Sequence, residues 1–413
     1  MILNKTLQVQ IISFLVAGLS QVFALSICSN QLSQSESSRY MYLLSMATLL
    51  SFLDFGIFWG LYIHLASSVD EPPKLIKKAF QKILQLGLLI ECFVLVGLFI
   101  SILPLDIVLT ISLILINNFF FVGLVALRGT RSENLYFIFF NLSWPMTFLI
   151  YSIMNLNSIA FHSIYAIVPL LSSIGINTIL CSYIFLAHLT NNDPGQYSKK
   201  KNYAIDDIPP SNLSIYAMGA QILTLCSLYG DRFLLFPKMQ SQEFLNYAVC
   251  IQFANVASVL IKNYNSSLVG DQLSGKKILK RDFLNAIPVI PFFGLISGFI
   301  YFFSMPFIAN VFFNKLAIDY FFLFLLSLNI FLIAILEEIY QNLWVNMKIG
   351  TRIMLQLIGI VNYICFVEFF LNHPVSKSEA AMALILINSG MFPYIFWVKM
   401  KQSRLKNRFD TSN

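Results

Sequence analysis

The stretch "DIVLTISLILINNFFFVGLVAL" (residues 106–127) is apolar almost throughout and carries one ionisable side chain, Asp106, at its first position. A helix needs about 20 mostly apolar residues to cross a hydrocarbon core of roughly 30 Å. Eleven further stretches of this kind occur, at about 7–28, 40–66, 83–102, 135–154, 160–189, 213–236, 244–268, 284–304, 319–342, 353–371 and 379–399. The pattern predicts an all-α polytopic membrane protein with about 12 transmembrane helices.

The composition of the whole chain agrees with this fold class. Of its 413 residues, 57% are hydrophobic and only 11% are charged, which lies far outside the range of soluble globular domains. A transmembrane β-barrel would show alternating segments of about ten residues, and the apolar stretches here are continuous. Helices are the remaining structure that satisfies its backbone hydrogen bonds inside a bilayer.

Basic residues give the orientation, because Lys and Arg near helix ends are retained in the cytoplasm. With the N-terminus inside, 22 of the 27 basic residues fall on the cytoplasmic side, and the other side holds Arg39, Lys238, Lys315 and Lys377. We therefore expect a multi-pass membrane protein with both termini in the cytoplasm. The net charge of +7 follows from this bias and does not indicate binding to nucleic acid.

No pattern predicts a metal, a cofactor or an enzyme active site. The six cysteines form no C-x-x-C pair, and the four histidines are scattered. The segment "GDQLSGKK" (270–277) has the glycine and lysine spacing of a phosphate-binding loop, but Lys277 stands where a magnesium-binding hydroxyl belongs and no buried strand precedes it. A basic cytoplasmic loop explains this segment.

The spans divide into two halves. The longest polar stretch, 191–212, predicts a cytoplasmic linker between an N-terminal six-helix lobe (1–190) and a C-terminal one (213–399), followed by a basic tail (400–413). Glu36 and Tyr40 recur in the second half as Glu243 and Tyr247, each time where a span begins. The matching spacing favours a parallel six-plus-six repeat.

Ionisable residues inside spans are informative, since each costs at least about 2.5 kcal/mol at the bilayer centre unless it is paired or faces water. Asp54, in "SFLDFGIFWG", lies near the middle of its span, and Glu91 lies about a third of the way along the next. Each is a candidate for ion coupling or for a polar contact that fixes helix packing. Prolines at 145, 169, 288 and 291 predict interrupted helices.

The stretch "SLYGDRFLLF" (227–236) places Asp231 and Arg232 side by side near the outer end of a span. Adjacent helical residues point about 100° apart, so we expect each charge to have its own partner. The repeat aligns the two residues with Ala24 and Leu25 of the first half. The first half therefore does without these charges, which leaves a specific function and an interfacial anchor as alternatives.

Two segments carry a family resemblance: "LSQSESSRYMYLLSMATLLSFLDFGIFWGLYIHLAS" (32–67) and "GDRFLLFPKMQSQEFLNYAVCIQFANVAS" (230–258). They resemble the O-antigen and polysaccharide flippases (Wzx-type) of the MOP superfamily, which also holds the MATE drug exporters and the lipid II flippases. The sequence departs from the usual pattern at Ser37 and Phe244, where a glycine commonly follows the acidic residue.

The resemblance implies two six-helix lobes around a central cavity that opens alternately to each side. Its implied cargo is an undecaprenyl-pyrophosphate-linked oligosaccharide, with membrane lipids and the polysaccharide polymerase machinery as partners. On this reading Arg128 and Lys262 capture the pyrophosphate near the cytoplasmic entrance and Arg232 does so near the exit. Asp231 would hold a neighbouring helix, and Asp54 or Glu91 would couple transport to an ion gradient.

Two other functions remain open. A MATE-type cation-coupled drug exporter would carry an acidic residue in span one or seven, whereas span one has none and Asp231 has Arg232 beside it. A membrane-embedded O-antigen polymerase would need a large outer loop with catalytic Arg or His, whereas every predicted outer loop is short.

Overall fold

The structure is a computed structural model that describes residues 5–50, 72–129, 133–157, 229–256, 289–345, 349–370 and 374–390, with a few isolated positions between them. These residues fall into two compact units. Unit 1 contains residues 1–222, 273–275 and 309–316, and unit 2 contains 223–272, 276–308 and 317–413. The predicted linker 191–212 and the tail 400–413 lie outside the described residues.

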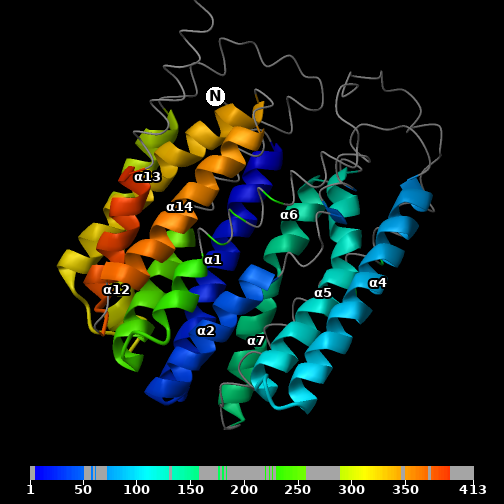
Figure 1. Cartoon of the computed structure of the whole chain (residues 1–413), viewed down its shortest axis with the longest axis horizontal. Helices are drawn as coiled ribbons and strands as arrows, with labels where there is room; N and C mark the ends of the chain where they lie inside the picture. The colour runs from blue at the N-terminus through cyan, green and yellow to red at the C-terminus, as the bar shows by residue number, and fades with distance from the viewer. Residues whose placement is uncertain are drawn as a thin grey trace, which may run out of the picture. The chain divides into compact units, whose positions relative to one another are not determined.

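Unit 1 is built on helices that pack along their lengths (Figure 1). Three helix pairs dominate the packing: α1 with α7, α4 with α5, and α1 with α6. The elements are α1 (Lys5–Gln31), α2 (Gln34–Leu50), α4 (Pro72–Phe99), α5 (Leu105–Gly129), α6 (Glu133–Asn141) and α7 (Ser143–Leu156).

Unit 2 contains most of α12 (Val289–Phe312) together with α13 (Tyr320–Val345) and α14 (Ile349–Phe370). Residues 229–235, 241–256 and 377–390 are also helical. Gly294 and Gly298 let α12 approach α13 closely, because a Cβ at either position would meet Ala334 or the Ser327 carbonyl at under 3 Å.

The expected fold class is confirmed. Every regular element in the described residues is a helix, and six of these helices, counting α6 and α7 as one, are long and apolar enough to cross a membrane. The molecule is a polytopic helical membrane protein. Its apolar side chains are exposed as well as buried, as expected for helices whose outer faces meet lipid rather than water.

Helix boundaries follow from local chemistry. Ser33 and Glu36 form a capping box before α2, in which the Glu36 carboxylate accepts from the Ser33 N–H at 3.1 Å and the Ser33 hydroxyl accepts from the Glu36 N–H at 3.3 Å. Ser376 and Glu379 repeat this arrangement before helix 377–390, at 2.8 and 3.3 Å. Between α4 and α5 the chain turns through Ser101, whose φ of 57° is left-handed.

Of the four prolines expected to interrupt helices, Pro145 and Pro291 lie in described residues, and Pro169 and Pro288 lie outside them. The break near Pro145 is confirmed, since α6 ends at Asn141 and α7 begins at Ser143. Pro291 lies in the first turn of α12, which is described from Val289, and the residues before it lie outside the described part of the chain. The proline inside α12 is Pro306, and the helix continues to Phe312, eight residues beyond the predicted end of the span.

The four basic residues expected on the outer side are all held by acceptors. Arg39 makes a bidentate pair with Asp106, at 2.7 and 3.0 Å. Lys238 lies 3.0 Å from a Glu368 carboxylate oxygen. Lys377 donates to the Ala317 carbonyl and lies 3.8 Å from Glu243. Lys315 donates to main-chain carbonyls at the end of α1. Each exception to the positive-inside bias therefore has a structural role.

Candidate functional site: a buried charge cluster in unit 2

Asp231 and Arg232 lie in the helical segment 229–235 and are both buried. Arg232 has 0% of its surface exposed and Asp231 has 3%, so neither touches solvent in this conformation. Burying an ionised side chain is costly unless partners replace the lost water, which makes their surroundings decisive.

Asp231 has a partner on a neighbouring helix, whereas the ring contact of Arg232 lies within its own helix. The Tyr247 hydroxyl, from the neighbouring helix 241–256, donates to Asp231 Oδ2 at 2.5 Å. The guanidinium carbon of Arg232 lies 4.9 Å from the ring centroid of Tyr229, which is a cation–π contact within its own helix. Tyr363 of α14 is buried near Tyr247, so three tyrosines surround the charges.

This arrangement bears on the expected exit-side phosphate contact. A pyrophosphate needs direct hydrogen bonds from a guanidinium, and Arg232 offers no exposed surface for them here. The role expected for Asp231, holding a neighbouring helix, matches its bond to Tyr247. In this conformation the pair joins helices inside unit 2.

The structure describes the other expected substrate contacts only in part. Arg128 lies in the last turn of α5, at the end predicted to face the cytoplasm. Lys262 and Asp54 fall outside the described residues. The roles of Arg128, Lys262 and Asp54 stay predictions.

Glu91 lies within α4 and is partly buried. The Ser112 hydroxyl of α5 lies 2.6 Å from Glu91 Oε1, a donor on the adjacent helix. Glu91 Oε2 is shielded from solvent and meets no hydrogen-bond donor among the described residues. Glu91 thus has one carboxylate oxygen bonded to the neighbouring helix and one that is shielded within the apolar surroundings of α4.

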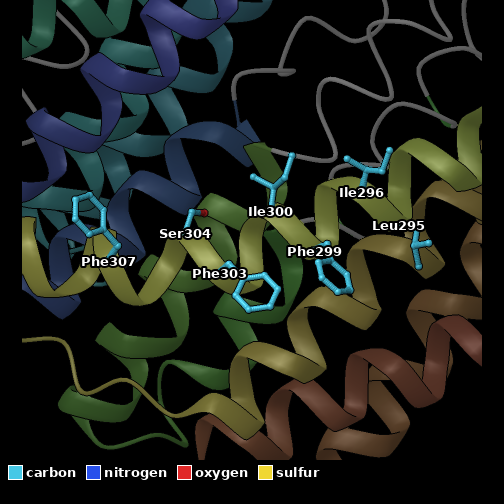
Figure 2. A pocket seen from close by; sticks show the side chains of 7 residues that line it. All are labelled: Leu295, Ile296, Phe299, Ile300, Phe303, Ser304 and Phe307. Carbon is cyan, nitrogen blue, oxygen red and sulfur yellow. The ribbon is translucent and has the colours of Figure 1, made fainter.

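An apolar groove runs along one face of α12 (Figure 2). Its volume is about 720 Å³, and its single polar side chain, Ser304, donates to the Tyr301 carbonyl. The lining residues share one helical face at spacings of three and four: Leu295, Ile296, Phe299, Ile300, Phe303, Ser304 and Phe307. The groove is suited to a hydrocarbon chain.

Sequence reasoning missed several partners and placed others correctly. The sequence singled out Tyr247 because it recurs with Tyr40 in the predicted repeat. Its hydrogen bond to Asp231 could be found only from the structure. Tyr229 is one turn before Arg232, so the i, i+3 spacing carried a signal. Two intramembrane asparagines have helix-packing roles, since Asn141 donates to Ser13 and Asn329 accepts from Asn388. Within the described residues no cluster of three potential metal ligands occurs.

Solved structures with this fold are membrane transporters. The chain matches an inward-facing conformation of a multidrug resistance MATE family transporter of the MOP superfamily over 96% of its length and 99% of that chain, with 13% identity and a TM-score of 0.66. It matches an outward-facing conformation of such a transporter over 98% and 99%, with 14% identity and a TM-score of 0.60. A crystal structure of MATE in complex with MaL6 matches over 98% and 100%, with 14% identity and a TM-score of 0.63.

No known family model and no curated protein matches the sequence. Identities of 13–14% support a common fold and leave the cargo undetermined. The chain therefore has the fold of the MATE transporters of the MOP superfamily.

Proposed function

We propose that the protein is an alternating-access transporter that moves undecaprenyl-pyrophosphate-linked oligosaccharides from the inner to the outer leaflet of the bacterial inner membrane. The fold supports transport, because its structural neighbours include both inward-facing and outward-facing transporters. The choice of cargo rests on charge.

The main support for this cargo is the distribution of acidic side chains. A cationic drug or coupling cation needs an available carboxylate, yet α1 contains no Asp or Glu. In the helix that corresponds to α1 in the second half, Asp231 is buried, hydrogen-bonded to Tyr247 and adjacent to Arg232. A guanidinium beside the carboxylate disfavours binding of a second cation. These features favour an anionic cargo over a cationic one.

The other end of the cargo is apolar, and the groove on α12 suits it. The prenyl chain of such a lipid is a flexible hydrocarbon, and the groove offers a continuous phenylalanine and aliphatic surface of about 720 Å³. Binding a prenyl chain there would leave the pyrophosphate and sugars to polar side chains outside the groove. We assign the pyrophosphate to Arg128 and Lys262, near the cytoplasmic helix ends.

Energy would come from an ion gradient, since the sequence has no nucleotide-binding motif. Glu91 is the described candidate for carrying a proton, because its Oε2 is shielded and has no donor in the described residues. Asp54 is the second candidate.

The test is the location of lipid-linked saccharides in cells that lack the protein. We expect the units to accumulate in the inner leaflet, protected from a periplasmic saccharide-binding probe, and to become accessible when the protein is restored. Normal accessibility in the deletion strain would refute the flippase. Increased sensitivity to cationic dyes with normally exposed saccharides would instead support the drug exporter.

A further inference from the structure

Residues 309–316 are fastened to the end of α1 by a set of polar contacts that we call the α1–α12 latch: Ser26, Asn30, Phe312, Asn314 and Lys315. The Ser26 hydroxyl and the Asn30 amide both donate to the Phe312 carbonyl, the latter at 2.9 Å. The Asn314 N–H donates back to Asn30 Oδ1 at 3.1 Å. Asn30 is therefore both a donor and an acceptor in contacts with residues more than 280 positions away.

Lys315 supplies the charge of the latch. Its ammonium donates to the carbonyls of Ser29 and Asn30, at 2.9 and 3.2 Å, and to that of Leu32. These carbonyls lie at or just after the end of α1, where helical hydrogen bonding leaves oxygens without partners. A lysine at this position acts as a cation at a helix C-terminus.

The latch brings together two helix ends of the same polarity. α1 ends at Gln31 and α12 ends at Phe312, and each C-terminus carries about half a negative charge. Two such ends repel each other unless a cation lies between them. Lys315 supplies a cation at the end of α1, and Ser26 and Asn30 supply donors to the Phe312 carbonyl at the end of α12, so these polar contacts offset the repulsion.

α12 also has a weak point close to the latch. Residues of α12 up to 308 belong to unit 2, whereas residues from 309 belong to unit 1. Pro306 lies two residues before this boundary and cannot donate to the Phe302 carbonyl four residues earlier. α12 can therefore bend near Pro306, close to the residue at which it passes from unit 2 to unit 1.

We propose that residues 309–316 form a strap, closed by the α1–α12 latch and hinged at Pro306, which opens and closes during transport. The strap stays on α1 while the latch is intact, and the bend at Pro306 lets the rest of α12 move. The link to transport rests on the proposed function, but the latch itself is tested in the resting protein.

The native Cys28 reports on the latch, because it lies in α1 between Ser26 and Asn30 and is fully buried. The assay measures its rate of labelling by a membrane-impermeant maleimide in a variant whose other five cysteines are replaced by alanine. We expect Lys315→Met to raise this rate about tenfold and Lys315→Arg, which keeps the cation, to leave it near the wild-type value. Lys238→Met is the matched control, because that lysine pairs with Glu368 inside unit 2.

Cys250 separates opening of the latch from general loosening, since it is buried in unit 2. In a Cys250-only background, Lys315→Met must leave labelling unchanged. Asn30→Ala removes the other half of the latch and must raise labelling of Cys28 as well. The proposal is overturned if both variants leave Cys28 unlabelled, or if Cys250 reacts as fast as Cys28 in both.

The hinge is tested with the cargo present. Adding lipid-linked saccharide to wild-type protein should raise Cys28 labelling severalfold, and Pro306→Ala should remove this rise by stiffening α12. Pro291→Ala, in the first turn of the same helix, should retain it. A different result is that Lys315→Met and Asn30→Ala raise Cys28 labelling as expected while the saccharide leaves labelling of the wild type unchanged. That result refutes the cargo assignment and retains the latch. An equal response in wild type and Pro306→Ala refutes the hinge.

Discussion

The repeat predicted from the sequence pairs two buried positions of α1 with two buried positions of unit 2 that hold side chains of opposite character. In α1 they hold Ala24 and Leu25, which are 0% and 1% exposed. The equivalent positions 207 residues later, from 24 to 231 and from 25 to 232, hold Asp231 and Arg232, which are 3% and 0% exposed. One half uses two apolar side chains and the other uses two charges.

The residues around these positions have diverged with them. Tyr40 in the first half shares a hydrogen bond with Tyr151 at 3.2 Å, whereas its equivalent Tyr247 donates to Asp231. Val22 stands where Tyr229 stacks on Arg232. The predicted repeat therefore implies that the fold accepts either pair and does not require the charges in unit 2.

The largest effect is expected from exchanging the pair. Asp231→Ala or Arg232→Leu alone leaves one buried charge without its neighbour and should lower the free energy of unfolding by about 3–5 kcal/mol. The double variant Asp231→Ala/Arg232→Leu recreates the pair found in α1 and should recover most of this loss. Denaturation of the purified protein in detergent measures all three.

The reverse exchange is the control. Ala24→Asp/Leu25→Arg places charges where Val22 offers no ring and should destabilise the protein at least as much as either single variant. If the double variant in unit 2 is as unstable as the single ones, the two halves are not interchangeable at these positions and the comparison fails.

A smaller difference should separate the two tyrosines. Tyr247→Phe removes a donor from a buried carboxylate and should cost about 2–3 kcal/mol. Tyr40→Phe removes a bond between two neutral hydroxyls and should cost about 1 kcal/mol. Equal losses in the same denaturation assay would show that Asp231 is not held as an ion by Tyr247.

The smallest difference concerns the outer ion pairs. Arg39 donates two hydrogen bonds to Asp106, and only 11% of the Asp106 side chain is exposed. Lys238 meets Glu368 with one donor, and 47% of the Glu368 side chain is exposed. We expect Arg39→Met to cost about 1 kcal/mol and Lys238→Met less than about 0.5 kcal/mol, because solvent screens the second pair. A larger loss for Lys238→Met than for Arg39→Met would contradict this ranking.

Much of the fold could be predicted because bilayer thickness imposes a length on every apolar helix. The stretch 106–127 lies within α5, and the predicted span at 319–342 lies almost wholly within α13. The predicted span ended at residue 304, just before Pro306, whereas the helix continues through Pro306 to contacts with α1. Such contacts lie more than 280 residues apart and leave no local pattern.

The candidate site was harder to predict than the fold. The rarity of charges in spans drew attention to Asp231 and Arg232, and their separation on the helix predicted separate partners. Their complete burial was not predictable, because burial depends on which helices surround the segment. The repeat with Ala24 and Leu25 held the clue, since both of these residues are buried as well.

The most direct test of the proposed cargo uses purified protein in liposomes that contain a fluorescent undecaprenyl-pyrophosphate-linked oligosaccharide. A membrane-impermeant reductant bleaches only the outer leaflet, so movement between leaflets appears as bleaching beyond about half of the signal. We predict nearly complete bleaching with the wild-type protein, and bleaching that stops at about half in protein-free liposomes. Bleaching that also stops at about half with folded wild-type protein, together with uptake of a cationic dye, would contradict the flippase and identify a drug exporter.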